Sequence, residues 1–360
     1  MLFSSDTPLS RIAFDCKPLK YPHTGLYSFC DQLTAALARE AFHRKERITA
    51  YVPGKETGRW KDQTDYRAAR FIDRLCFRLP SSIRVWHCSN QLKSLLPQGH
   101  IRVLTTVHDL NYLHEDLTPA QLKRREKKVS AILSRTDCFV AISEFTKQEL
   151  TTHYDLQGKP VHVIHNGCNL FQGPPGKPGY APHRKFLFSI GTILPKKNFH
   201  VLPCLLEDND YELLIAGIPS EYSMRIQEEA RQWGVADRLV LLGTISEAEK
   251  HWYYEHCSAF LFPSIAEGFG LPVVEAMYYG KPLFLSSYTC LPEIGGDCAY
   301  YFNGDFDRRQ MQQEFRQGMR HFSEGNISPQ QMRTRALSFS WENAARKYWE
   351  LYEELRNTIP

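Results

Sequence analysis

Short runs of aliphatic, β-branched and aromatic residues recur along this chain, and stretches with helical spacing separate them. This alternation predicts repeated βα units and a parallel sheet. The runs fall into two series. The first series consists of RIAFD (11–15), RITAYV (47–52), IRVWHC (83–88), RVLTTVHD (102–109), CFVAIS (138–143) and VHVIHN (161–166). The second consists of KFLFSIG (185–191), YELLIAG (211–217), LVLLGT (239–244), AFLFPS (259–264) and PLFLS (282–286).

A stretch dense in proline and glycine, FQGPPGKPGYAPHR (171–184), separates the two series. It cannot hold a helix or an interior strand, so we interpret it as a linker. In a chain of 360 residues we therefore expect two α/β domains, residues 1–170 and 185–338. Uninterrupted apolar strands are typical of a sheet that helices cover on both faces. We expect the site in the crevice between the domains, beyond the carboxyl ends of the strands.

The segment 339–360 is predicted to form an amphipathic helix, which Ser340 is placed to cap. Its apolar residues recur with helical spacing at Ala344, Tyr348, Leu351 and Leu355.

The composition excludes several classes of protein. With 42% hydrophobic and 23% charged residues, the chain is neither disordered nor fibrous. Its net charge of +4 is too small to indicate nucleic-acid binding by bulk charge. The ten cysteines are scattered without a C-x-x-C pair, and the N-terminus lacks a signal-peptide pattern, so we expect a reducing, cytoplasmic location. No apolar run reaches the roughly 18 residues that span a bilayer, so we expect any membrane contact to be peripheral.

The most informative motif is EGFGLPVVEA (267–276), which directly follows AFLFPS. Gly268 and Gly270 lie between the expected strand and a stretch with helical spacing, with Pro272 in its first turn. Such a strand-to-helix turn presents backbone N–H groups at the positive end of a helix, which favours phosphate binding. A helix start with glycines for tight packing is the alternative. The spacing is not G-x-G-x-x-G, which argues against a dinucleotide fingerprint.

Two acids flank this turn. Glu275 would lie about one turn into the helix, where a carboxylate can accept hydrogen bonds from a ribose diol. Glu267 precedes the turn and could bind hydroxyls on the other side of the phosphates. Sugar, phosphate and ribose follow one another in this order in a nucleotide sugar.

EGFGLPVVEA resembles the E-x7-E motif of retaining glycosyltransferases with the GT-B fold, in particular glycosyltransferase family 4 (group 1) and its bacterial mannosyl and hexosyl transferases of surface polysaccharide assembly. Further similar stretches extend over nearly the whole chain. They are TTVHDL (105–110), AISEFTKQEL (141–150), VIHNGCNL (163–170), SIGTILPKKNFHVL (189–202) and SWENAARKYWELY (340–352).

The resemblance implies two Rossmann-like parallel-sheet domains that face each other across a cleft, with the C-terminal helix crossing back to the N-terminal domain. The N-terminal domain would bind the acceptor and the C-terminal domain the nucleotide sugar. The implied reaction moves a hexose, with mannose as a family-level guess, from a GDP or UDP donor to a hydroxyl of a glycan or lipid-linked acceptor. The anomeric configuration would be retained, and the implied setting is lipopolysaccharide, O-antigen or related polysaccharide biosynthesis.

Family roles carry over where positions match, and the resemblance implies three catalytic residues: Lys197 on the diphosphate, His108 on the donor sugar, and Glu267. Family members often have arginine directly after the strand's glycine, where this chain has Thr192; Lys196 could compensate. The expected donor-binding residues are Gly25, Gly191, Thr192, Lys196, Lys197, Gly217, Gly243, Thr244, Ile245, Glu267, Gly268, Phe269, Gly270, Leu271 and Glu275.

Several of these residues also have a purely structural interpretation. An isolated Lys-Lys pair is commonly a solvated loop, and a lone histidine is usually a structural residue. Gly25 is equally compatible with a turn that opens a helix. Ser143 is better explained as a helix cap, and Gly167, with its neighbour Asn166, as part of the architecture.

We expect no cofactor and no metal, because Lys197 and the helix end can neutralise the leaving diphosphate. The segment LKRREKKVS (122–130) concentrates five cations on a predicted helix. It is either a solvated face or a patch that favours peripheral docking at the inner face of an anionic membrane. We expect no nucleic-acid partner.

Two other classes of function compete with glycosyl transfer. Another GT-B enzyme, a nucleotide-sugar epimerase or a phosphorylase, would act on related substrates; a phosphorylase would need a pyridoxal-type lysine site and a longer chain. A non-catalytic sugar-nucleotide binding module is the second. The joint presence of Glu267, Glu275, Lys197 and His108 argues against the module.

Overall fold

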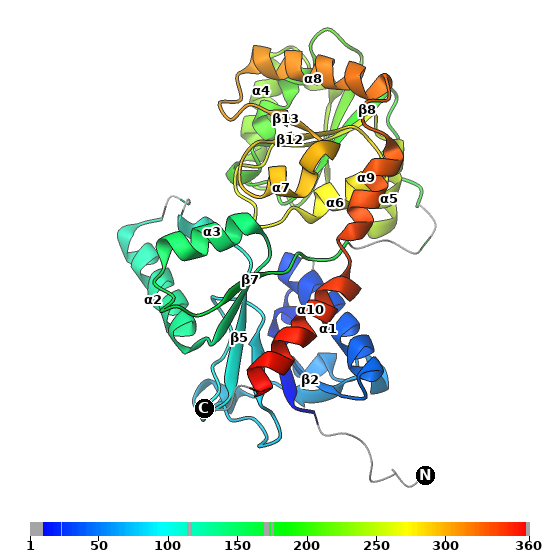
Figure 1. Cartoon of the computed structure of the whole chain (residues 1–360). Helices are drawn as coiled ribbons and strands as arrows, with labels where there is room; N and C mark the ends of the chain where they lie inside the picture. The colour runs from blue at the N-terminus through cyan, green and yellow to red at the C-terminus, as the bar shows by residue number, and fades with distance from the viewer. Residues whose placement is uncertain are drawn as a thin grey trace. The chain divides into compact units, whose positions relative to one another are not determined.

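A computed structural model describes residues 10–357, apart from 23, 114, 116, 169–172, 174 and 175. The chain forms two compact units (Figure 1). Unit 1 comprises Met1–Gly167 and Ser340–Pro360, and unit 2 comprises Cys168–Phe339. The predicted linker, 171–184, lies partly outside the described residues.

Unit 1 is built on a seven-stranded parallel sheet with strand order β3-β2-β1-β4-β5-β6-β7. Its strands are β1 (Ile12–Asp15), β2 (Ile48–Val52), β3 (Asp65–Ala68), β4 (Val85–Cys88), β5 (Arg102–Val107), β6 (Cys138–Ala141) and β7 (Val161–Val163). Its α-helices are α1 (Gly25–His43), α2 (Pro119–Arg135), α3 (Glu144–His153) and α10 (Trp341–Asn357). Short 3-10 turns are η1 (Lys17–Lys20), η2 (Gly54–Glu56), η3 (Lys61–Gln63), η4 (Phe71–Arg74) and η5 (Asn111–Leu113).

Alternate residues of these strands pack on opposite faces of the sheet. Phe14 belongs to the core that α1 and α10 cover, whereas its neighbour Ala13 packs under the segment 69–101. On β5, Val103 contacts that same segment, and Val107, four residues on, packs against α2. The segment 69–101 and α2 therefore cover the same face, opposite α1 and α10.

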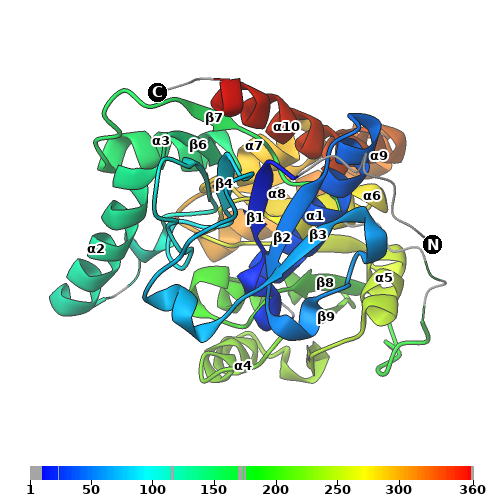
Figure 2. The same cartoon turned by 90° about the horizontal axis from the view of Figure 1, so that it is seen from below.

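The last helix, α10, completes the core of unit 1, although it follows unit 2 in the sequence. Figure 2 shows α10 beside α1. Tyr348, Trp349 and Tyr352 are almost fully buried. The Tyr352 hydroxyl lies 2.6 Å from Nδ1 of His87 on β4, and the Trp349 indole N–H donates to a carbonyl of α1. Gly167 leaves no room for a side chain beside Trp341, since an added Cβ would lie 2.3 Å from the indole.

Unit 2 contains a six-stranded parallel sheet with strand order β10-β9-β8-β11-β12-β13. Its strands are β8 (Phe186–Ile190), β9 (Glu212–Ala216), β10 (Leu239–Gly243), β11 (Ala259–Phe262), β12 (Leu283–Ser286) and β13 (Tyr300–Phe302). Its α-helices are α4 (Ser223–Gln232), α5 (Glu247–His256), α6 (Leu271–Tyr278), α7 (Leu291–Gly295), α8 (Arg308–Ser323) and α9 (Pro329–Ser338). Its 3-10 turns are η6 (Pro195–Lys197), η7 (Phe199–Val201), η8 (Pro203–Leu206), η9 (Ala236–Arg238) and η10 (Gly296–Cys298).

The prediction of a parallel α/β sheet in each half is confirmed, and each predicted apolar run contains a strand. Two edge strands, β3 and β13, were not predicted. Their sequences, DYRA and YYF, are short, and most of their residues are only half-buried, so they lack the long apolar run of an interior strand.

Candidate active site

Four loops of unit 2 lie close together at the carboxyl-terminal end of its sheet, because they follow the carboxyl ends of neighbouring parallel strands. Gly191 follows β8, Gly217 follows β9, Gly243 ends β10, and the turn that contains Glu267 follows β11. This end is where parallel sheets of this kind bind their ligands.

Gly191 and Gly217 bring two backbones into direct contact. A Cβ atom on Gly217, whose φ is +150°, would lie 1.8 Å from the carbonyl oxygen of Gly191. The Gly191 N–H donates to Ala216 at 3.0 Å, and the Gly217 N–H donates to Gly243 at 2.7 Å. The floor of the site between β8 and β10 is therefore bare backbone, which a ligand can approach closely.

Lys197 lies over this floor, at the end of η6. Its Cε would lie 3.2 Å from a Cβ on Gly191. Its ammonium group forms an ion pair with the Glu267 carboxylate and lies 4.9 Å from the centroid of the Phe262 ring. Both charged side chains are 14% exposed, so this is a partly buried ion pair at the edge of the sheet, not a solvated loop lysine.

The lysine loop is also tied to the turn after β11 through the backbone. The carbonyl of Lys196 accepts hydrogen bonds from the Ile265 N–H at 2.9 Å and the Ser264 hydroxyl at 3.1 Å. Lys196 therefore contributes its backbone carbonyl to this connection. Thr192 is exposed.

The turn of the E-x7-E motif has the predicted strand-to-helix form. Gly270, with φ +91°, is the N-cap of α6, and a Cβ there would lie 2.9 Å from the side chain of Leu291. Pro272 lies in the first turn of the helix. Gly268 and the buried Phe269 precede the cap, and the Phe269 ring packs edge-on against Phe339.

The second acid of the motif, Glu275, is buried on α6. Lys250 of α5 lies 3.1 Å from one of its carboxylate oxygens, and the Tyr254 hydroxyl donates to the other at 3.0 Å. Burial raises the pKa of Glu275, and the neighbouring Lys250 opposes that shift. Each acid of the motif thus forms an ion pair with a different lysine: Glu267 with Lys197, and Glu275 with Lys250.

The remaining residues of unit 2 that were expected to bind the donor lie at this carboxyl-terminal end of the sheet. Gly243, with φ +70°, ends β10, and the exposed Thr244 and the half-buried Ile245 follow it. Leu271 is the first residue of α6 and is half-buried.

His108 and Gly25 lie in unit 1. His108 follows β5, and its Nε2 lies 2.8 Å from the carbonyl oxygen of Ser89, with the ring edge-on to Phe29. Burial lowers the pKa of His108 to about 4, so the ring is neutral at pH 7. Because a carbonyl only accepts, Nε2 carries the proton and Nδ1 is the acceptor of this neutral ring.

Gly25 is exposed at the first position of α1, where Thr24 is the N-cap and accepts from the Tyr27 N–H. A Cβ on Gly25 would meet no atom within 4 Å, so the fold itself does not require glycine there. Ser143 caps α3 by accepting from the Thr146 N–H at 3.1 Å, as expected.

Sequence reasoning missed the contacts of Glu275 with Lys250 and Tyr254. It also overlooked two Asp-x-Asp sequences, 208–210 and 305–307, of the kind that can hold a divalent metal between phosphates. The first precedes β9 and so lies at the amino end of that strand, away from the glycine loops. In the second, Asp307 caps α8 by accepting from the Gln310 N–H at 2.9 Å.

Solved structures share this architecture. A sucrose-phosphate synthase from Thermosynechococcus elongatus has a TM-score of 0.72 at 17% identity and covers 96% of this chain and 99% of its own. Alr3699/HepE of Anabaena, crystallised with UDP and glucose, has a TM-score of 0.65 at 13% identity and covers 96% of this chain and all of its own. These two parallel-sheet units have the GT-B fold of glycosyltransferases.

The family follows from the sequence comparisons. The model for Glycosyltransferase Family 4 matches residues 29–171, and the model for Glycosyl transferases group 1 matches residues 176–338. The chain therefore belongs to the family 4 (group 1) glycosyltransferases and is a glycosyltransferase.

Curated relatives include two bacterial enzymes. O-antigen chain mannosyltransferase B of Escherichia coli is 24% identical, and the alignment covers 96% of this chain and all of that protein. O-antigen chain mannosyltransferase RfbU of Salmonella typhimurium is 25% identical over 56% of this chain and 57% of its own length. No helix in the described part of the chain is long and apolar enough to cross a membrane.

Proposed function

We propose that this glycosyltransferase moves a hexose, mannose in the first instance, from a nucleoside diphosphate donor to a hydroxyl of a glycan or lipid-linked acceptor in bacterial surface polysaccharide assembly. The observation that carries the proposal is the Lys197–Glu267 ion pair, which lies at the carboxyl edge of the unit 2 sheet beside the bare backbone of Gly191. The names of the O-antigen mannosyltransferase relatives support the choice of sugar and setting.

In this proposal the diphosphate lies between Lys197 and the N-terminus of α6. The Lys197 ammonium group neutralises the charge that develops on the leaving diphosphate, and the Leu271 N–H at the start of α6 adds a donor. Pro272 has no N–H, and the Val273 N–H donates to the Gly270 carbonyl at 2.9 Å. Glu267 already holds that ammonium group in place, which lowers the cost of ordering a long side chain. The second carboxylate oxygen of Glu267 would accept a hydrogen bond from a sugar hydroxyl.

The transfer proceeds with retention at the anomeric carbon. The bond between that carbon and the diphosphate oxygen breaks, and the bond to the acceptor oxygen forms on the same face of the sugar. The acceptor's hydroxyl proton passes to the leaving phosphate oxygen. His108 does not act as a nucleophile in this scheme; its neutral Nδ1 accepts a hydrogen bond from a sugar hydroxyl.

Glu275 is the proposed ribose contact. Its present partners, Lys250 and Tyr254, keep the carboxylate oriented at the side of α6. A diol would add its hydrogen bonds to a carboxylate whose charge Lys250 already balances.

Product analysis with labelled GDP-, UDP- and ADP-sugars tests the proposal. Free nucleoside diphosphate together with a glycosylated acceptor is the expected result, and the product's anomeric configuration should match that of the donor. An epimerised donor without transfer would instead support an epimerase, and binding without turnover would support a binding module.

The reaction is further proposed to need no metal, with Lys197 and the α6 N-terminus in the metal's role. We expect full activity in EDTA. Activity that EDTA abolishes and Mg²⁺ restores would contradict this part of the proposal. The Asp-x-Asp sequence 305–307, which follows the carboxyl end of β13, would then be the first candidate for metal binding.

A further inference from the structure

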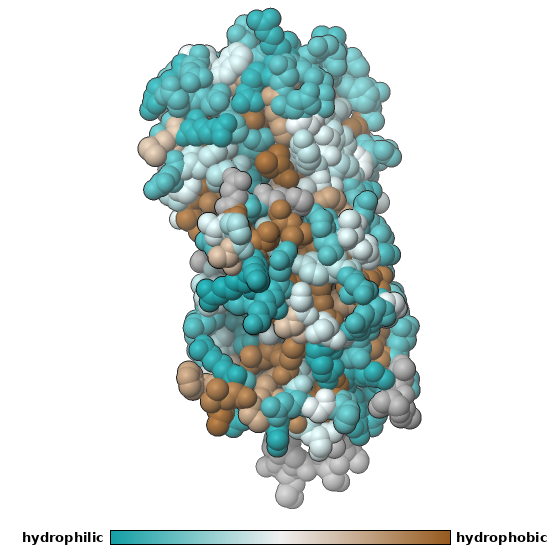
Figure 3. All heavy atoms as spheres, turned by 90° about the vertical axis from the view of Figure 1, so that its left-hand side faces the viewer, coloured by the Kyte–Doolittle hydropathy of each residue, from teal (hydrophilic) through white to brown (hydrophobic). Residues whose placement is uncertain are grey.

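The turn η4 and the residue after it expose three large apolar side chains within five positions. Phe71 is 78% exposed, Ile72 58% and Leu75 80%. We call these three residues the apolar face. Brown side chains protrude at the lower left of Figure 3, on unit 1, in a view of the side that carries α2. Exposed apolar side chains gathered in this way mark interaction sites in folded proteins.

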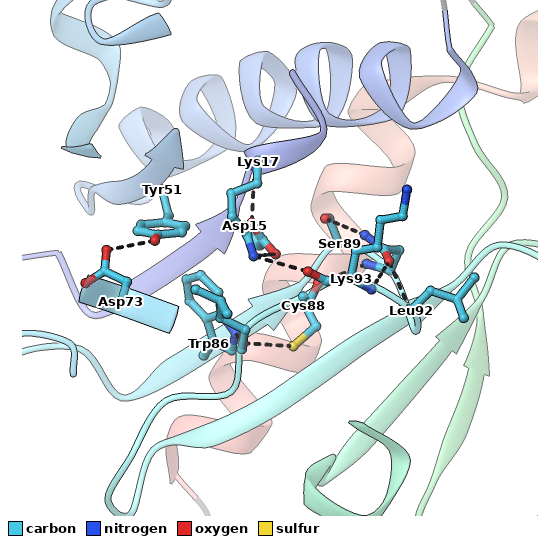
Figure 4. A network of polar contacts seen from close by, with 12 residues as sticks. Asp15, Lys17, Tyr51, Asp73, Trp86, Cys88, Ser89, Leu92 and Lys93 are labelled. Carbon is cyan, nitrogen blue, oxygen red and sulfur yellow. Dashed lines mark hydrogen bonds and ion pairs between the residues drawn. The ribbon is translucent and has the colours of Figure 1, made fainter. Parts of the chain in front are cut away.

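The apolar face is held rigidly by the segment beneath it. Asp73 is buried within η4 and accepts hydrogen bonds from the Tyr51 hydroxyl at 2.8 Å and from the Arg70 N–H at 2.9 Å. Figure 4 shows the contact between Tyr51 and Asp73. Phe77 is buried against Tyr51 and Trp86. The fold therefore fixes the turn so that its apolar side chains point outward.

The surroundings of the apolar face are strongly basic. Residues 69–84 contain four exposed arginines, Arg70, Arg74, Arg78 and Arg84, and a single acid, the buried Asp73. The Arg74 guanidinium lies 5.4 Å from the Phe71 ring centroid, so charge and apolar surface are interleaved.

Helix α2 extends the basic surface on the same face of the sheet. It carries the five cations of 123–128, of which Arg125 pairs with Glu115. Arg135, at its end, donates to the carbonyls of Gly99 and Ile101, in the segment that also holds η4. The apolar face and the α2 cations thus belong to one side of unit 1.

We propose that this side of unit 1 docks on an anionic lipid bilayer, with Phe71, Ile72 and Leu75 inserted among the headgroups and the arginines around them on lipid phosphates. Apolar insertion combined with basic residues is the requirement for peripheral binding to such a surface. The inference deepens the proposed function, since it rests on an acceptor that is lipid-linked.

Co-flotation with vesicles tests the inference. Wild-type protein should float with vesicles that contain about one third phosphatidylglycerol and much less with phosphatidylcholine alone. The double variant Phe71→Ser/Leu75→Ser should lower the partition coefficient roughly tenfold or more. Phe42→Ser is the matched control, because Phe42 is 80% exposed at the end of α1, which covers the opposite face, and it should float like wild type.

Two further measurements separate the outcomes. Circular dichroism and transfer to a water-soluble glycan acceptor should be unchanged in the double variant, whose substitutions lie outside the donor site. Equal flotation of wild type and double variant would overturn the docking surface. So would a double variant that floats normally but changes from dimer to monomer in light scattering, because the apolar face would then join two copies of the chain. Transfer to the soluble acceptor reports on the proposed function in either case.

Discussion

At the scale of single residues, the candidate site contains two lysines and two acids, which form two ion pairs at the carboxyl-terminal end of the unit 2 sheet. Lys197 meets Glu267 and Lys250 meets Glu275, and each pair is largely removed from water. In such surroundings a charge is stabilised mainly by its partner, so removal of either lysine leaves its acid largely buried and uncompensated. Removal of Glu275 would cost less, because Lys250 also pairs with Glu247 at 2.8 Å. The effect of a substitution therefore has a structural part and a catalytic part.

Lys197→Met should lower kcat/KM by roughly two to three orders of magnitude, because it removes the cation that we propose faces the developing diphosphate charge. Lys197→Arg should recover part of that loss. The matched control is Lys185→Met, since Lys185 is exposed and directly precedes β8, at the amino-terminal end of the sheet. Thermal unfolding measured in parallel separates a loss of stability from a loss of turnover. A kcat/KM for Lys197→Met within threefold of wild type would contradict the assigned role.

At the scale of elements, the loops after the strands of unit 2 position the candidate site mainly through backbone contacts. Gly191 and Gly217 touch, and the 3-10 turn that carries Lys197 is tied to the turn after β11 by hydrogen bonds to a Lys196 carbonyl. A side chain at Gly217 would force β8 and β9 apart at their carboxyl ends, whereas a side chain at Gly191 would displace the Lys197 side chain.

Gly217→Ala should destabilise unit 2 by about 2 kcal/mol or more, because its Cβ would overlap the Gly191 carbonyl and φ +150° is strained for alanine. Gly25→Ala is the control, since its Cβ would meet nothing within 4 Å and alanine favours a helix; its stability should change by less than about 1 kcal/mol. Urea unfolding measures both. A neutral Gly217→Ala would show that the β8 and β9 loops can separate without cost.

The sequence predicted the interior strands and the E-x7-E turn because both have local patterns. An interior strand is an uninterrupted apolar run, and the turn has two glycines before a helix. It missed β3, which has no such run. It also missed the partners of Glu275, because Lys250 and Tyr254 approach from another helix and only packing brings them together. The apolar face was missed for the opposite reason: Phe71 and Leu75 resemble core residues in sequence, and only the structure shows them exposed.

At the scale of the whole molecule, unit 1 is assembled from two separate stretches of chain. The helix α10 supplies seven buried residues, the aromatic Trp341, Tyr348, Trp349 and Tyr352 among them, to a core whose other buried residues lie within 12–164. Burial of aromatic side chains of this size contributes several kcal/mol to a domain's stability, of order 2 kcal/mol each.

Removal of residues 340–360 should therefore unfold unit 1 and leave unit 2 folded, because Cys168–Phe339 is continuous. Limited proteolysis should then cut readily within residues 10–167 while 185–339 stays protected. Tyr352→Phe is the mild comparison: it removes the hydrogen bond to His87 but keeps the packing, and should cost about 1 kcal/mol. A truncated chain whose first half resists protease would contradict the role given to α10.

Because α10 belongs to unit 1, the two units complete their folding at different times during synthesis of the chain. Unit 2 is a single stretch of chain and can fold as soon as Phe339 has left the ribosome, whereas the core of unit 1 cannot close until residues 340–357 have been made. The half that is translated first is thus the half that is finished last, and its unclosed aromatic core is the part of the nascent chain that most needs shielding from aggregation.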